Sequence, residues 1–377
     1  MDIKFIDLHA QYLSIKDEID RGIAEVINNS SFILGPSVKR FEESFAEYCA
    51  SKEAIAVNSG TSALLLILRA LGIGPGDEVI TAANTFIATV AAIVETGARP
   101  VLVDVDPVTR LIDLDQIEAA VTEKTRAIMP VHLYGCMVDM DKVLAIAERH
   151  DLPVIEDAAQ AHGARLKDRP AGSYGIAAGF SFYPAKNLGA YGEGGAIVTS
   201  DKKLAGRIRK LRDHGSERKY FHDYFGYNAR MDGIQGAVLG VKLKYLDAWN
   251  RGRNRVAGRY REELSGMPLK LPREFKHFYQ VYHQFVVESE VRNELQQFLS
   301  RNNIPTLIHY PIPVHQQKAY ARAGFKDGSF PVTEKLAQSV LSLPVYPELT
   351  DEEIGHITAK IREFFGKEYQ DTLRLEN

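Results

Sequence analysis

The sequence has little of what marks several large classes of protein. Only two of its 377 residues are cysteines, Cys49 and Cys136, and they stand far apart. This arrangement excludes a disulfide framework and matches no zinc-site spacing, which predicts a reducing compartment and no metal site. The apolar runs contain polar residues and are too short to cross a membrane. The N-terminal stretch MDIKFIDLHAQY lacks the basic and apolar regions of a signal peptide. We therefore expect a cytoplasmic protein with no membrane partner.

Charge of either sign is not in large excess. The chain has 46 Lys and Arg against 49 Asp and Glu, a formal net charge of −3. A nucleic-acid partner is therefore not indicated. Hydrophobic residues make up 45% of the chain, which suffices for a large core. The length corresponds to two or three domains of about 150 residues each.

From residue 54 onward, strand-like and helix-like patterns alternate. Strands are expected at 54–60, 77–86, 99–106, 126–135 and 152–160, and helices at 61–73, 87–97, 114–122 and 139–151. Continuous apolar strands separated by helices are typical of a mostly parallel sheet with helices on both faces. The predicted fold class is therefore α/β. Ligands of such folds bind at the carboxyl ends of the strands, where this sequence places its polar clusters.

The pattern changes after about residue 235. Residues 231–265 read as one long helical region, bent at a glycine, that links a large domain to a smaller one. A strand and two helices follow, at 282–289, 290–303 and 350–367. Thr350 with acidic residues behind it opens the last helix in the manner of a capped start. We expect a large α/β domain at 1–245, including an N-terminal helical segment, and a small α+β domain at 246–377.

Thr61 and Ser62 follow the first of these strands. The turn Ser59–Gly60 leads directly into a helix, whose first amides have no internal partner. Together with the helix dipole, such amides form a site for a phosphate group. An ordinary helix cap is the alternative for these residues taken alone. No lysine follows as in a P-loop, so a nucleoside triphosphate is not indicated.

Asp157 follows an apolar run at 152–155, where a buried strand should end. A carboxylate in this position is costly without a cationic or hydrogen-bonding partner. A protonated ring nitrogen of a cofactor would be such a partner, and so would a structural salt bridge or a helix cap. Glu156 is the weaker candidate, because adjacent strand residues face opposite ways.

Lys186 lies in FSFYPAKNLGAYGEGGAIVT, between two predicted strands. A lysine on an exposed turn is the plain alternative. An amine desolvated in a glycine-walled pocket, however, has a lowered pKa, becomes nucleophilic and forms Schiff bases. Ser181, five positions earlier, can offer its hydroxyl to an anion. With an acid for a ring nitrogen and a helix N-terminus for a phosphate, the set fits pyridoxal phosphate.

Six separated motifs resemble, in order, those of the DegT/DnrJ/EryC1/StrS sugar aminotransferases. They are SGTSAL, GPGDEVI, TFIAT, VIEDAAQAHGA, SFYPAKNLGAYGEGGAIVT and GYNARMDGIQGA. The resemblance covers nearly the whole chain. It implies a fold-type-I aminotransferase scaffold that uses pyridoxal 5'-phosphate, in a homodimer whose active sites lie at the interface.

The same resemblance implies a role for each matching residue. Lys186 would bind the cofactor as a Schiff base and then move the proton, and Asp157 would keep the pyridine nitrogen protonated. Phe86 would stack on the ring, and Gln160 would lie near the ring hydroxyl. The phosphate contacts would be Thr61, Ser62, Ser181 and, from the neighbouring subunit, Asn228.

The lysine motif and PTLIHYPIPVHQQ, at 305–317, look like the branch that aminates C-3 of keto-sugar nucleotides. The sugar contacts would be His309, Tyr310, Tyr183, Lys219 and Arg230. The alternatives are a packed ring for Tyr183, a solvated charge for Lys219 and one member of an ion pair for Arg230. The implied donor is L-glutamate, which leaves as 2-oxoglutarate. The implied acceptor is a dTDP-3-keto-6-deoxyhexose, or else a UDP-linked 3-keto sugar, for glycan, polysaccharide or antibiotic biosynthesis.

Three other functions compete with this interpretation. They are a C-4 keto-sugar aminotransferase, a pyridoxal-phosphate-dependent sugar dehydratase, and a regulatory protein on a borrowed scaffold. The C-4 branch usually has a histidine shortly before the lysine, and the dehydratases replace the lysine with histidine, whereas Lys186 is retained here. Several C-3 enzymes have an aspartate where Ser62 stands, so the sequence leaves the exact sugar open.

Overall fold

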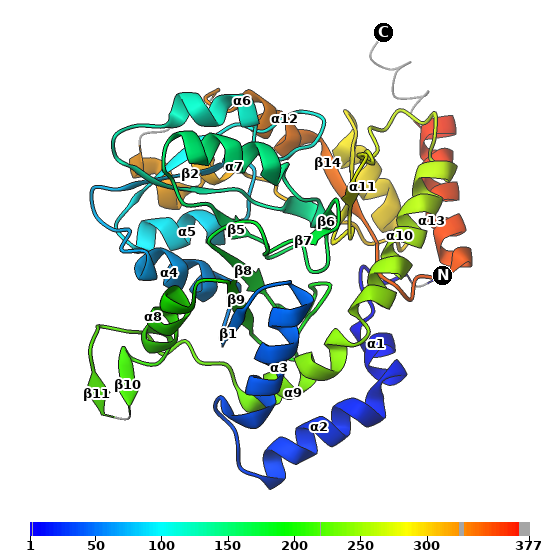
Figure 1. The fold of residues 1–377 in the computed structure, drawn as a ribbon. Coiled ribbons are helices and arrows are strands. Elements are labelled where there is room, and N and C mark those ends of the chain that lie inside the picture. The colour runs from blue at the N-terminus through cyan, green and yellow to red at the C-terminus, as the bar shows by residue number, and fades with distance from the viewer. Residues whose placement is uncertain (2, 219, 324–327, 369–377) are drawn as a thin grey trace.

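A mostly parallel sheet forms the centre of the molecule (Figure 1). The computed structural model describes residues 1, 3–218, 220–323 and 328–368. Across the sheet the strands are β1 (Glu53–Val57), β9 (Gly195–Thr199), β8 (Ala177–Ser181), β5 (Ile155–Asp157), β4 (Thr125–Met129), β2 (Glu78–Ala82) and β3 (Arg99–Val103). Isolated parallel bridges, Ile128 to Val154 and Val131 to Asp157, join the β4 and β5 segments. β9 is antiparallel to both of its neighbours, and the other pairs are parallel.

Helices cover both faces of this sheet, because successive residues of a strand point to opposite sides. In β1, Ala54 and Ala56 pack into one core, and Ile55 and Val57 pack into the other. The first core includes residues of α3 (Gly35–Tyr48), α7 (Met140–Arg149) and α9 (Gly233–Leu243), and the second includes residues of α4 (Gly60–Ala70), α5 (Ile87–Glu95) and α8 (Lys202–Arg212). The predicted α/β fold class is confirmed.

The remaining elements lie at the edges of this body. The N-terminal helices are α1 (Leu8–Ser14) and α2 (Lys16–Asn28), and α6 (Leu114–Ile117) is a single turn. Strands β6 (Arg165–Leu166), β7 (Arg169–Pro170) and β12 (Phe278–Tyr279) form a small antiparallel sheet. Strands β10 (Ser216–Arg218) and β11 (Phe221–His222) form a hairpin that projects from the body at the lower left of Figure 1.

The C-terminal part builds a core of its own. This core contains residues of α10 (Leu246–Glu263), β13 (Phe285–Glu288), α11 (Arg292–Arg301), β14 (Val340–Leu343) and α13 (Asp351–Glu363), whereas α12 (Pro331–Ser339) packs into the first core of the sheet through Leu336. Tyr260, Phe285 and Ile357 are fully buried in this core. Thr350 and Glu353 form the expected capping box at the start of α13. The boundary predicted at residue 245 falls just before α10, and the division into two domains stays a prediction.

The expected single helix over 231–265 is wrong. The chain forms two helices, α9 and α10, that are separated at Lys244 and Tyr245 and not at a glycine. Gly236 remains inside α9, where it packs closely against Val38 of α3. The break is therefore set by packing, because α9 lies on α2 and α3 whereas α10 contacts α13.

The strand expected at 126–135 is also too long. β4 ends at Met129, because Pro130 has no amide for a sheet ladder and Tyr134 takes a positive φ of 61° within a short turn. Of the helices in the described residues, none combines the length and the apolar character needed to cross a membrane.

Candidate active site

The N-terminus of α4 meets the end of β8. Ser59 caps the helix by accepting a hydrogen bond from the Ser62 amide at 3.1 Å, so the cap is Ser59 and not Thr61 or Ser62. Gly60 allows a close approach, because a Cβ at this position would lie 2.6 Å from Cβ of Ser181. The fold thereby brings together Thr61, Ser62 and Ser181, three of the four residues predicted to bind a phosphate, and Thr61 is exposed there.

Asp157 ends β5 and is 4% exposed. Its carboxylate accepts a hydrogen bond from Thr89 Oγ1 at 2.7 Å and one from the Ala159 amide at 3.2 Å. Both donors are neutral, and no cation of the described residues lies within hydrogen-bonding distance of it. Burial raises the pKa of Asp157, and the bond from Thr89 opposes this rise. The carboxylate therefore has two hydrogen-bonding partners, and the described residues leave it without a cationic one.

Lys186 lies in the loop that follows β8, and its Nζ is 3.5 Å from Nε2 of His283. Burial lowers the pKa of Lys186 to about 8, while the charge of Asp157 acts in the opposite direction. The loop turns tightly at Gly189, where a Cβ would lie 2.1 Å from the carbonyl oxygen of Pro184. The amine is thus desolvated, and the loop that carries it turns tightly at a glycine.

Glu156 points to the other side of the sheet from Asp157. It is fully buried, and its carboxylate accepts bonds from three backbone amides at 2.8 Å, those of Gly172, Tyr174 and Gly175. His132 Nε2 lies 3.0 Å from the same carboxylate. Burial raises the pKa of Glu156, but the bonds from His132 and the amides outweigh it, and the net pKa is lowered. Glu156 and His132 therefore belong to the structural core.

Gln160 and Tyr310 form one wall of the site. Gln160 Nε2 donates to the Tyr310 hydroxyl at 3.0 Å, and its Oε1 accepts from the Tyr134 amide at 2.7 Å. The rings of Tyr310 and Phe86 lie 5.6 Å apart between centroids. Phe86 is 51% exposed, which leaves part of its ring free for a further aromatic group.

His309 lies beside this wall, with Nδ1 2.8 Å from the Ser342 hydroxyl. Burial lowers the pKa of His309 to about 4, and the charge of Lys186 adds to this effect. The imidazole is therefore neutral at physiological pH and can present one ring nitrogen to a substrate hydroxyl.

The other predicted contacts lie outside this group. Tyr183 is 54% exposed in the Lys186 loop. Asn228 is exposed, and its backbone carbonyl accepts a bond from Asn58 Nδ2 at 3.4 Å. Arg230 donates to Asp213 at 2.8 Å, which is the ion pair that the sequence offered as its alternative. Lys219 lies outside the described residues.

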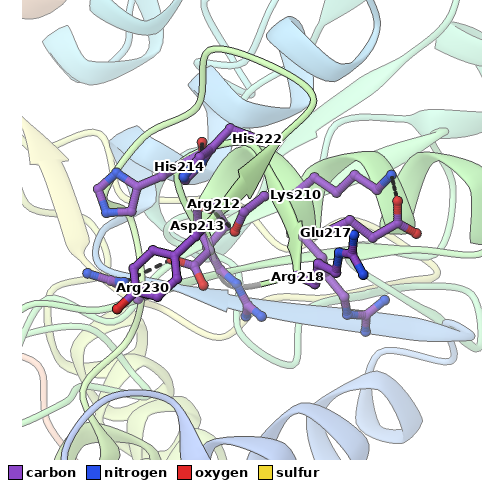
Figure 2. A pocket seen from close by; sticks show the side chains of 11 residues that line it. Lys210, Arg212, Asp213, His214, Glu217, Arg218, His222 and Arg230 are labelled. Atoms are coloured by element: carbon purple, nitrogen blue, oxygen red, sulfur yellow. Dashed lines mark hydrogen bonds and ion pairs between the residues drawn. The ribbon is translucent and has the colours of Figure 1, made fainter.

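Arg230 also lines a separate cavity of about 600 Å³ between α8 and the β10–β11 hairpin. Figure 2 shows Arg230 beside Asp213 at one end of this cavity and Lys210 beside Glu217 at the other. Since these cations have carboxylate partners, the cavity is less basic than its residue list suggests. It does not include Lys186 or Asp157.

Sequence reasoning did not identify His283, Asn187 or Thr89 as parts of the site. His283 stands in a strand-like stretch, YHQFVV, and Thr89 stands in a helix, so neither carries a local signal. Asn187 follows Lys186 directly and belongs to its motif. Only the fold brings His283, 97 positions away in the chain, to Lys186.

A small molecule with an aldehyde, a basic ring nitrogen and a phosphate would meet Lys186, Asp157 and the α4 N-terminus. Pyridoxal 5'-phosphate has these three groups. The fold and the site thus define a pyridoxal-phosphate enzyme built on a mostly parallel sheet.

Comparison with known families narrows this class. The profile of the DegT/DnrJ/EryC1/StrS aminotransferase family matches residues 13–362, and the chain belongs to this family. The predicted family, the fold class and an aminotransferase activity on nucleotide sugars are confirmed.

Particular relatives cover nearly the full chain. A protein from Geobacillus stearothermophilus, named pleiotropic regulatory protein, is 48% identical over 97% of this chain and 99% of its own. The dTDP-3-amino-3,4,6-trideoxy-alpha-D-glucose transaminase of Streptomyces venezuelae is 46% identical over 96% of both chains. The UDP-N-acetyl-3-dehydro-alpha-D-glucosamine 3-aminotransferase of Acidithiobacillus ferrooxidans is 45% identical over 96% of this chain and 97% of its own.

Solved structures agree with this placement. The crystal structure of S. venezuelae DesV in complex with a ketimine intermediate is 45% identical, with a TM-score of 0.95 over 96% of this chain and 98% of that one. NtdA of Bacillus subtilis with the bound cofactor PMP is 34% identical, with a TM-score of 0.90 over 97% of this chain and 86% of that one.

Proposed function

We propose that this protein transfers the amino group of L-glutamate to a 3-keto sugar nucleotide and so forms a 3-amino sugar nucleotide. Its cofactor is pyridoxal 5'-phosphate. The single observation that carries the proposal is the pairing of a desolvated amine, Lys186, with a buried carboxylate, Asp157, that has no cationic partner among the described residues. The relatives that act on 3-keto or 3-amino sugars support the position of amination.

Each residue of the site has a separate role in the proposed reaction. Asp157 holds a proton at the ring nitrogen, because no cation of the described residues binds its carboxylate. The bound cofactor then supplies the electron sink that makes the donor α-proton acidic. With a pKa of about 8, Lys186 Nζ is neutral in about a tenth of the molecules at pH 7 and can take up that proton. The α4 amides, Ser62 and Ser181 anchor the phosphate.

The sugar is proposed to lie between Tyr183 and the segment that carries His309 and Tyr310. Neutral His309, fixed by Ser342, offers a hydrogen bond that does not change with pH in the working range. A dTDP-linked 6-deoxy sugar is the favoured acceptor, and a UDP-linked sugar is the second. Relatives that act on each kind are about equally similar to this chain, so the substrate panel below has to decide between them. The product would serve glycan, polysaccharide or antibiotic biosynthesis.

A homodimer with shared sites is part of the proposal. The segment from the β10–β11 hairpin to Asn228 exposes large apolar side chains, with Phe221 55%, Tyr224 48% and Phe225 104% exposed. Such a group on one projecting segment is typical of a protein contact. A second copy that covers it would bring Asn228 and Arg230 to the partner's site. A cytoplasmic location stays a prediction.

The test of this function starts from the visible spectrum. Addition of pyridoxal 5'-phosphate to the purified protein should produce an absorption band that Lys186→Ala abolishes and the surface control Lys203→Ala retains. A panel of dTDP- and UDP-linked 3-keto and 4-keto sugars with glutamate, followed by mass spectrometry, identifies the acceptor. A wild-type protein that develops no band would refute the proposal, and amination of 4-keto sugars alone would refute the C-3 assignment. A regulatory role would be supported only by a wild-type protein that develops no absorption band.

A further inference from the structure

His283 contacts the side chain of Lys186. It is 6% exposed, and its Nε2 is 3.5 Å from Lys186 Nζ. Its backbone is held on two sides. Arg253 of α10 donates to the His283 carbonyl at 3.5 Å, and a Cβ at Gly135 would lie 2.8 Å from the His283 amide nitrogen. The backbone that carries the imidazole is therefore closely packed beside Lys186.

Asn187 fixes which ring nitrogen of His283 carries the proton. Asn187 Nδ2 lies 2.9 Å from the carbonyl oxygen of Val281, which can only accept a hydrogen bond. This contact sets the orientation of the amide, so the Asn187 Oδ1 faces His283 Nδ1 at 3.2 Å. Nδ1 must therefore carry the hydrogen, and Nε2 presents a lone pair to Lys186.

His283 stays in this neutral form. Burial lowers the pKa of His283 well below its ordinary value, and the charges of Lys186 and Arg253 act in the same direction. His309 and His162, which also face it, each oppose a positive charge on it. A neutral imidazole with its Nδ1 hydrogen committed cannot act as a proton donor at Nε2. Its one available role toward the lysine is that of a hydrogen-bond acceptor.

We propose that His283 is a positioning residue that accepts a hydrogen bond from Lys186 Nζ and holds the free amine in place, an inference that rests on the proposed function. An amine has two N–H groups and one lone pair. When one N–H is committed to His283, the lone pair has two staggered orientations left, and both point away from the imidazole. His283 thus restricts the orientation of the Lys186 amine whenever the amine is not bonded to the cofactor. The amine then has fewer orientations to sample before its lone pair points toward the reacting atoms.

Two variants separate this role from a purely structural one. In His283→Gln the amide oxygen can take the place of Nε2 and accept from Lys186, but the donor to Asn187 is lost. In His283→Asn the amide nitrogen can replace Nδ1 and donate to Asn187, but the acceptor for Lys186 is lost. The proposal requires the glutamine variant to behave more like wild type, whereas a structural role requires the asparagine variant to do so.

The first measurement uses cofactor-free protein. The rate at which an acylating reagent labels Lys186 is followed against pH by peptide mass spectrometry, and its midpoint reports the amine. The wild-type midpoint should lie at about 8. Because a neutral acceptor favours the charged form, His283→Asn should lower the midpoint by about one unit, which makes about five times more neutral amine at pH 7. His283→Gln should stay within a few tenths of the wild-type value.

The second measurement uses the cofactor-loaded enzyme in single turnovers with glutamate. His283→Asn should slow proton transfer about 10- to 100-fold, with cofactor affinity unchanged within about threefold, and His283→Gln should recover most of the rate. An unchanged midpoint in both variants, or a normal rate in the asparagine variant alone, would overturn the inference. If wild type binds no cofactor, the proposed function fails, while the labelling midpoints still test His283.

A wild-type measurement covers the case in which a variant does not fold. Selective ¹⁵N labelling of histidine in the cofactor-free protein reports the tautomer of each ring. His283 should give an unprotonated Nε2 across the neutral pH range, and its shift should respond when Lys186 is acylated. A protonated Nε2 at His283 would refute the inference without any substitution.

Discussion

The contact between Gly60 and Ser181 gives the most direct test of the proposed phosphate site. A Cβ added at Gly60 would lie 2.6 Å from Ser181 Cβ, 3.1 Å from its Cα and 3.2 Å from its Oγ. Carbon atoms in van der Waals contact lie about 3.5–4.0 Å apart, so Gly60→Ala must move the α4 N-terminus and the end of β8 apart by ~1 Å. The Cβ and Cα of Ser181 are fixed to the backbone and cannot rotate away, so the backbone has to move.

Two quantities should change together. Overpacking of this kind costs about 1–3 kcal/mol in the free energy of unfolding. The same displacement separates the α4 amides from the Ser181 hydroxyl, and we expect the dissociation constant of pyridoxal 5'-phosphate to rise about tenfold or more, since 1.4 kcal/mol is a factor of ten. Absorbance titration measures the affinity, and chemical unfolding measures the stability.

Gly206→Ala is the matched control. Gly206 lies in α8, and a Cβ there meets no atom within 4 Å. Alanine favours a helix over glycine by about 1 kcal/mol, so this variant should be as stable as wild type or more so, with the cofactor affinity unchanged. A Gly60→Ala protein that binds the cofactor as tightly as wild type would refute the placement of the phosphate between α4 and Ser181.

Two further predictions concern the buried Lys242 of α9 and the sharing of active sites between subunits. Burial lowers the pKa of Lys242 to about 7 from 10.5. The unfolded chain therefore binds more protons between these values, so the stability of wild type should rise with pH through this window by up to about 1.4 kcal/mol per unit. Lys242→Met should flatten that rise in unfolding curves, and parallel pH curves for the two proteins would contradict the reasoning. If active sites are shared, mixing inactive Lys186→Ala with inactive Asn228→Ala subunits should restore about a quarter of wild-type activity through mixed dimers, whereas sites built from one chain would restore none.

The part of the site that lies at the ends of predicted strands could be predicted from the sequence. Lys186, Asp157 and Ser181 stand at or just beyond predicted strand ends, and the carboxyl ends of parallel strands meet at one edge of a sheet. Glu156 and Asp157 could be assigned opposite faces from their adjacency alone. These inferences needed only the period of the strand and the order of the elements.

The partners that tune these groups could not be predicted. Thr89 reaches Asp157 from a helix 68 positions earlier, and His283 reaches Lys186 from the C-terminal half. The break between α9 and α10 was misplaced for the same reason, because packing against different neighbours sets it and no residue type marks it. Such contacts depend on the three-dimensional arrangement of elements whose local patterns carry no sign of it.

The loop that carries Lys186 is held from three separate elements. Lys242 of α9 donates to the Gly189 carbonyl at 2.6 Å. Gln235 of the same helix accepts from the Tyr191 amide at 2.9 Å, and Asn187 binds Asn250 of α10 and the Val281 carbonyl, each at 2.9 Å.

A loop held at residues 187, 189 and 191, once through a side chain and twice through the backbone, has little freedom to move during the reaction. The motion that the reaction requires must then occur in the side chain of Lys186, about its own torsions. This is why an acceptor at the tip of that side chain, His283 Nε2, matters more than further restraint on the loop. Glycine is required at residue 189 for the same loop, because any Cβ there would clash with the Pro184 carbonyl. Such a clash would open the turn that positions Lys186.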